Sequence, residues 1–230
     1  MSTKFELNAF LDQTFFGIDT LTMLGDVEDF IGFSESNIGW QKHRELRRTE
    51  QECNDTEFNA PRLEAQYRDQ MLEGVEYRFD VSLTQRVRYA GLIALITTVE
   101  WVLLALKKRT VFEFPKKTEK AEKRNEAVHA LSVFNEKAAI GLEQEVQLLE
   151  SLSQIRNCIV HAAGLLASYK HEPELRRRLV GLSGLRVSNF NFLGESIEIE
   201  AGFLEGVIRD ARVWLPNVEK ALSDRGLVSQ

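Results

Sequence analysis

Three side chains of complementary chemistry, Arg156, Asn157 and His161, lie close together in a segment that is otherwise apolar. A guanidinium donates two hydrogen bonds to phosphate oxygens, and an imidazole titrates near neutral pH and transfers protons as a general acid or base. Asn157 precedes His161 by four residues, so a helix places both on nearly the same face. Polar groups in an apolar helix are costly unless they have a partner or a function. The segment is therefore a candidate site for phosphate binding and proton transfer.

The spacing between arginine and histidine is weak evidence by itself. With 18 arginines, 4 histidines and three separations counted (four to six intervening residues), about one match is expected by chance. A second match is present at Arg124, Asn125 and His129, but it follows a charged segment whose side chains can face water at little cost. We favour the first match because it lies among apolar residues at helical spacing. These are Leu148, Leu149, Leu152, Ile155, Ile159 and Val160.

The segment from Ile155 to Gly164 resembles the signature of the HEPN family (higher eukaryotes and prokaryotes nucleotide-binding). That signature is an arginine, often followed by asparagine, and a histidine after four to six residues. The resemblance is best over residues 82–170, and it implies a mainly α fold, an up-and-down helical bundle of the HEPN type. Many HEPN proteins are ribonucleases, usually dimers with a composite cleft.

From this resemblance we expect a metal-independent endoribonuclease that cleaves RNA by attack of the 2′-hydroxyl, with Arg156, Asn157 and His161 as its catalytic residues. We expect no cofactor and no metal, because phosphate-binding glycine loops and zinc-ligand spacings are absent from the sequence. Such an enzyme would act as a toxin or antiviral-defence effector. An antitoxin or another regulatory protein would then restrain it.

Two alternatives remain open. A non-catalytic HEPN module would bind a partner protein or a nucleotide. In a purely structural helical protein the motif would be a coincidence: Arg156 would pair with a carboxylate, Asn157 would bond to the backbone and His161 would be a surface histidine. A small antitoxin or a nucleotidyltransferase encoded next to this gene would favour the ribonuclease.

The helical positions of the motif predict a homodimer. On a helical wheel, apolar residues from Leu148 to Ile159 form one stripe, while Arg156 and His161 lie about 140° apart on the remaining surface with Val160 between them. One copy does not easily direct both side chains at a single phosphate. Two copies related by a two-fold axis bring both sets together, with Val160 packed near the axis.

Other residues are candidates for supporting roles. Glu100, in an apolar helix, is either a buried partner for Arg156 or an ordinary carboxylate that faces a groove or solvent. Clusters of basic residues are candidates for RNA contacts, although a run of charge is more often a solvated face. They are Lys116, Lys117, Lys120, Lys123, Arg124, Arg176, Arg177 and Arg178.

Three helices are expected to form the core around the motif. Ser82 is expected to cap a helix that ends near Arg109, and its apolar residues on most faces predict a central position. A second helical pattern runs over residues 118–142, and the motif helix follows and ends near Ala163. Gly164 marks either a slackening of that helix or a close approach of another element.

The segments on either side predict additional elements. Residues 5–33 predict one or two amphipathic helices, and residues 61–77 another, with Pro61 in its first turn. Alternating residues around Gly194 predict a β-hairpin, and a last helix over 203–223 contains Pro216, which should kink or break it. We divide the chain, as one compact unit, into an N-terminal helical extension (1–81), a HEPN-like core (82–170) and a C-terminal hairpin with a helix (171–230).

Composition narrows the function classes. The net charge of −6 argues against a nucleic-acid footprint over the whole surface, so any RNA contact must be local. Cys53 and Cys158 lack zinc-type neighbours, which favours a reducing, cytoplasmic environment. The first residues do not resemble a signal peptide, and the apolar run 91–106 contains Glu100 and is shorter than a membrane span. We expect it to be a buried helix and expect no membrane contact.

Overall fold

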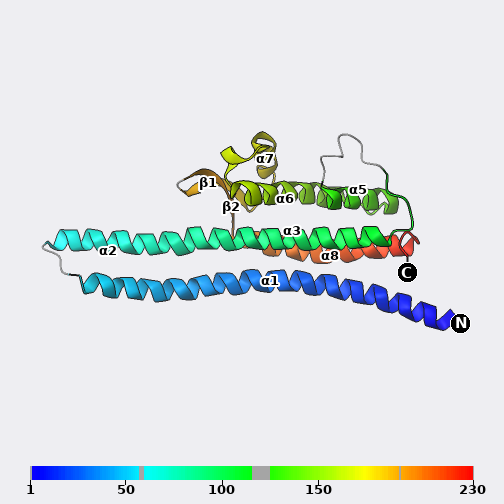
Figure 1. Cartoon of the computed structure of the whole chain (residues 1–230), viewed down its shortest axis with the longest axis horizontal. Helices are drawn as coiled ribbons and strands as arrows, with labels where there is room; N and C mark the ends of the chain where they lie inside the picture. The colour runs from blue at the N-terminus through cyan, green and yellow to red at the C-terminus, as the bar shows by residue number, and fades with distance from the viewer. Residues whose placement is uncertain (1, 57–59, 116–124, 192, 230) are drawn as a thin grey trace.

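The structure, a computed structural model, is mainly helical with one small two-stranded antiparallel sheet, as the sequence predicts (Figure 1). It describes residues 2–56, 60–115, 125–191 and 193–229, with side chains from residue 19 onward. The candidate RNA contacts Lys116, Lys117, Lys120, Lys123 and Arg124 lie outside the described residues.

Two very long helical segments lie side by side and antiparallel (Figure 1). The first is α1, Ser2–Asn54. The second is continuous and contains α2 (Pro61–Glu76), a π-helical segment (Tyr77–Leu83) and α3 (Thr84–Arg109). Pro61 is in the first turn of α2, where its missing N–H has no intrahelical partner to lose.

The helix boundaries predicted from the sequence for these two long helical segments were partly wrong. α1 continues from Ser34 to Asn54, where the apolar pattern weakens, because this part packs along one side only, on the second helical segment, and its other faces meet water. Ser82 does not cap a new helix, since the chain passes through it in π-helical conformation.

The helical segment Pro61–Arg109 is long and apolar enough to cross a membrane, by length and composition alone. Half of its most apolar 18-residue stretch is buried inside the protein, as in the core helix of a globular domain.

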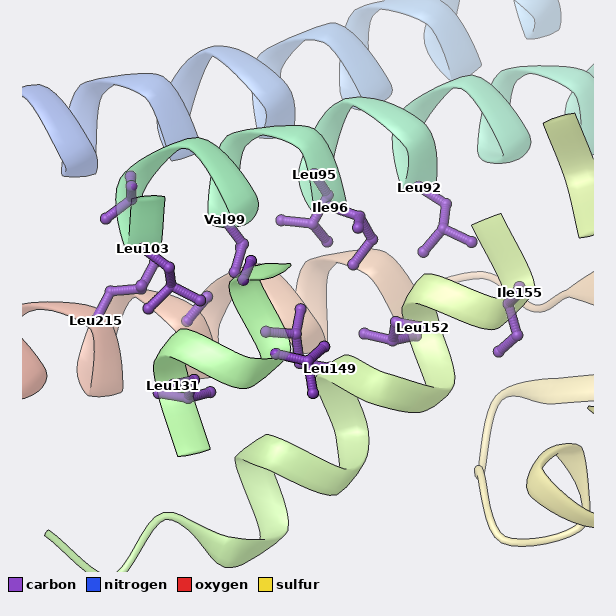
Figure 2. Packing of buried hydrophobic residues seen from close by; sticks show 14 of the residues in the cluster. Leu92, Leu95, Ile96, Val99, Leu103, Leu131, Leu149, Leu152, Ile155 and Leu215 are labelled. Carbon is purple, nitrogen blue, oxygen red and sulfur yellow. The ribbon is translucent and has the colours of Figure 1, made fainter. Parts of the chain in front are cut away.

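α5 (Glu126–Ala138) and α6 (Glu143–Ala162) lie along one side of α3, and α8 (Phe203–Asp224) lies along α3 as well (Figure 1). Leucine, isoleucine and valine side chains of these four helices meet in one buried cluster, which also includes α1 residues. Figure 2 shows its centre. Labelled there are Leu92, Leu95, Ile96, Val99, Leu103, Leu131, Leu149, Leu152, Ile155 and Leu215.

The C-terminal part contains the predicted hairpin, β1 (Leu185–Asn191) paired antiparallel with β2 (Gly194–Ile199). A short helix that the sequence did not reveal, α7 (Glu172–Leu179), precedes it. α8 runs on through Pro216 without a break, contrary to one of the two expectations for this proline. Burial of apolar residues on both sides of the proline outweighs the lost hydrogen bond.

Gly164 is a point of close approach. It has a φ of +81°, and a Cβ at this position would lie 2.3 Å from the Tyr89 hydroxyl oxygen. Gly164→Ala should therefore lower the free energy of unfolding by about 2–4 kcal/mol through backbone strain and overlap with Tyr89. Gly141→Ala is the matched control, since Gly141 has the same φ of +81° but no atom within 4 Å of its Cβ position. Equal losses in urea unfolding would show that the Tyr89 contact contributes nothing.

Glu219 is a buried carboxylate on α8 whose Oε1 accepts a hydrogen bond from Arg109 Nη1 at 2.8 Å. Burial raises its pKa above the ordinary 4.5, and Arg109 offsets this only in part. The folded state therefore binds the proton more tightly than the unfolded chain does, and this contribution to stability is lost as the pH rises above 4.5. Glu219→Gln should gain stability relative to wild type in urea titrations as the pH rises above 4.5, because the amide has no proton to lose. A difference that does not change with pH would contradict this.

Candidate functional site

Arg156 is held by Glu100, which confirms one of the two alternatives for that carboxylate. Arg156 Nη2, on α6, donates to Glu100 Oε1, on α3, at 2.7 Å. The side chains are 24% and 18% exposed, respectively, so the pair is shielded on most sides but is still open to solvent. Glu100 therefore fixes the position of the guanidinium against α3.

The same carboxylate oxygen accepts two further hydrogen bonds. Asn125 Nδ2 donates to Glu100 Oε1 at 2.5 Å, and Ser153 Oγ donates to it at 3.5 Å. Asn125 also caps α5, since its Oδ1 accepts from the Ala127 N–H at 2.8 Å. Asn125, from the match at residues 124–129, and Arg156, from the favoured match, therefore bind the same carboxylate of Glu100. We call Glu100 with these partners and Ser153 the acidic centre.

Asn157, Val160 and His161 lie on the outer side of α6. Val160 is 51% exposed and His161, in the last helical turn, is exposed. Within the described part of the chain, the side chains of Asn157 and His161 have no hydrogen-bond partner. The structure thus brings Arg156 together with Glu100, while His161 remains on another face of α6, as the helical wheel predicts.

His129, the histidine of the other match, is near Pro115 and Phe114. Its Nε2 is 3.4 Å from the Pro115 carbonyl oxygen, and its ring meets Phe114 edge-on at 6.3 Å between centroids. Its partner in that match, Arg124, lies outside the described residues. The contacts of His129 are therefore those of a packed side chain.

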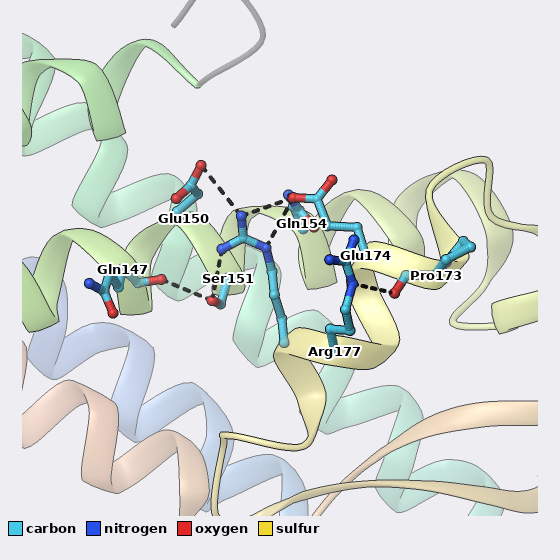
Figure 3. Close-up of polar contacts among 8 residues, drawn as sticks. Gln147, Glu150, Ser151, Gln154, Pro173, Glu174 and Arg177 are labelled. Carbon is cyan, nitrogen blue, oxygen red and sulfur yellow. Dashed lines mark hydrogen bonds and ion pairs between the residues drawn. The ribbon is translucent and has the colours of Figure 1, made fainter. Parts of the chain in front are cut away.

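Carboxylates neutralise much of the basic cluster on α7. Arg176 pairs with Glu172 and Glu195, and Arg178 Nη2 is 2.9 Å from Glu174 Oε1 and 3.5 Å from Glu150 Oε1. Figure 3 shows how Glu150, Ser151, Gln154 and Glu174 converge between α6 and α7. Arg177 is exposed and donates to the Pro173 carbonyl oxygen at 3.2 Å. Arg177 therefore remains the better candidate for an RNA contact in this cluster.

Cys158, inside the motif, is fully buried, and its Sγ faces the Leu165 carbonyl oxygen at 3.8 Å. Burial raises the pKa of its thiol to about 12, and the negative charge of Glu172 adds to the effect. A thiol that stays protonated at neutral pH is a poor nucleophile. Cys158 therefore has the packing role that its helical position predicts.

The sequence did not identify Asn125 and Ser153 as hydrogen-bond donors to Glu100. Asn125 carried a usable signal, since an asparagine before a helical pattern is a typical N-cap. Ser153 carried none. No family model, curated protein or solved structure matches this chain. A functional assignment therefore rests on the residues and on their geometry.

Proposed function

We propose that the protein is a metal-independent endoribonuclease of the HEPN type, active as a homodimer, with a composite site formed by Arg156, Asn157 and His161. The observation that carries the proposal is the outer surface of α6. There an exposed apolar residue, Val160, lies between a guanidinium oriented by Glu100 and an exposed imidazole. A partner copy packed on Val160 would bring its own His161 toward Arg156.

The three residues divide phosphate binding and proton transfer between them. Arg156 donates to the scissile phosphate; five N–H donors are available on a guanidinium, and Glu100 engages Nη2. The substrate 2′-oxygen attacks phosphorus, the bond to the 5′-oxygen breaks, and the products are a 2′,3′-cyclic phosphate and a 5′-hydroxyl end. His161 either takes the proton from the 2′-hydroxyl or gives one to the leaving 5′-oxygen, and Asn157 orients the imidazole or the phosphate.

Mixing two inactive variants tests whether the site is shared. If each site takes Arg156 from one copy and His161 from the other, a dimer of Arg156→Ala with His161→Ala retains one intact site. After exchange of subunits, the mixture should regain about a quarter of the wild-type rate, since half of the dimers are mixed and one of their two sites is complete. Cleavage of a labelled RNA in EDTA gives the rate. No recovery, or a monomer at micromolar concentration in light scattering, would contradict the composite site.

One observation favours the alternative of a non-catalytic HEPN module that binds a partner protein or a nucleotide. Arg156 Nη2 is already paired with a carboxylate within the chain, as in a structural arginine, although its buried Nε has no hydrogen-bond partner among the described residues. A clean dimeric preparation that cleaves no RNA in EDTA would support that module. As an effector in toxin–antitoxin or antiviral-defence systems, the active enzyme would need a restraining protein.

A further inference from the structure

A pocket of about 510 Å³ lies between α3, the end of α6 and the β-hairpin, and neither Arg156 nor His161 lines it. Its size is in the range of small-molecule sites. Most of its lining is apolar or aromatic. The principal wall residues are Tyr89, Ile93, Ile159, Leu165, Phe190 and Leu193.

Free hydrogen-bonding capacity is concentrated at one end of this pocket. Gln85 already makes two hydrogen bonds: its Nε2 donates to the Ile199 carbonyl oxygen at 2.9 Å, and its Oε1 accepts from the Ile199 N–H at 3.0 Å. The Tyr89 hydroxyl donates to the Ile197 carbonyl oxygen. In contrast, neither Ser82 nor the exposed Arg86 has a partner among the described residues, and they lie one helical turn apart.

The opposite end is apolar. Ile93 lies eleven residues beyond Ser82, which corresponds to about 16 Å along the helix. Ile93 and Ile159 both line the pocket. The pocket is thus elongated, with a hydroxyl and an unpaired cation at one end and aliphatic side chains at the other.

The backbone around the pocket is shaped for it. Ser82 belongs to the π-helical segment, and π-helical turns are frequent at functional sites. At the other wall, Gly164 follows α6 and lies so near Tyr89 of α3 that no Cβ would fit between them.

We propose that this pocket binds an amphipathic anion, with its apolar body between α3 and Ile159 and its anionic group on Arg86 and Ser82. The shared chemistry is an apolar body with one terminal anionic group. An aromatic carboxylate such as 2-naphthoate and an aliphatic carboxylate such as decanoate both have it. The site is independent of RNA cleavage, because it uses neither Arg156 nor His161.

The test uses the full-length protein and the fluorescent probe 8-anilinonaphthalene-1-sulfonate, an aromatic body with one sulfonate. Wild type should bind it at one site, and Arg86→Ala should weaken binding about tenfold through loss of one charge-assisted contact. Ala90→Trp, which fills the pocket from an exposed position of α3, should abolish binding. Arg62→Ala, at an exposed arginine of α2 outside the pocket, should bind like wild type.

Competition identifies the source of the anion. Displacement of the probe by 2-naphthoate assigns an aromatic ligand, and displacement by decanoate assigns an aliphatic one. Displacement by neither at millimolar concentration, or wild-type binding by Arg86→Ala and Ala90→Trp, would overturn the proposal. Circular dichroism of each variant shows whether it is folded. RNA cleavage by the same variants is a separate readout, so either proposal can fail without the other.

Discussion

His161→Ala is expected to lower the rate of RNA cleavage in EDTA by about 100- to 10,000-fold, the usual range for loss of a general acid or base. The side chain is exposed and has no hydrogen-bond partner among the described residues, so its removal should leave the free energy of unfolding within about 0.5 kcal/mol of wild type. A loss of activity without a loss of stability would separate a chemical role from a structural one.

His129→Ala is the matched control for this prediction. His129 belongs to an identically spaced match but packs against Phe114 and approaches the Pro115 carbonyl. It should retain the wild-type cleavage rate and lose some stability. If cleavage disappears only with His129→Ala, the functional match is the one at residues 124–129, and our assignment of the site is wrong.

Glu100→Ala is expected to lower the free energy of unfolding by about 2–4 kcal/mol, because it removes one acceptor from three donors at once. Arg156, Asn125 and Ser153 all donate to Glu100 Oε1. The residual exposure of the ion pair keeps the expected loss below that of a fully buried pair. Urea unfolding measures the change.

A double-mutant cycle isolates the ion pair from the rest of this loss. In Glu100→Ala/Arg156→Ala the unpaired cation is absent, so the double variant should be more stable than the sum of the single losses predicts. Glu136→Ala, at an exposed glutamate of α5, is the control and should change stability by less than about 0.5 kcal/mol. Strictly additive losses would show that Glu100 and Arg156 do not depend on one another.

Local periodicity was enough to predict several elements. α6 was predictable because its apolar residues recur with helical spacing, and the β1–β2 hairpin because its residues alternate around Gly194. The full length of α1 was not predictable, since the part from Ser34 onward packs along one side only and carries polar residues on its other faces. The same holds for α7, which is too short for a clear period.

For the candidate site, the sequence by itself determined which faces of α6 are apolar and polar, because side-chain direction follows from the helical repeat. It therefore placed Arg156 and His161 on separate faces, with Val160 between them. Only the tertiary structure decided between the two roles considered for Glu100, and it added Asn125 to the same carboxylate. Glu100 and Arg156 are 56 residues apart in the chain, and their contact depends on how α3 and α6 pack. No local pattern encodes that packing, because it is set by the burial of side chains from several helices at once.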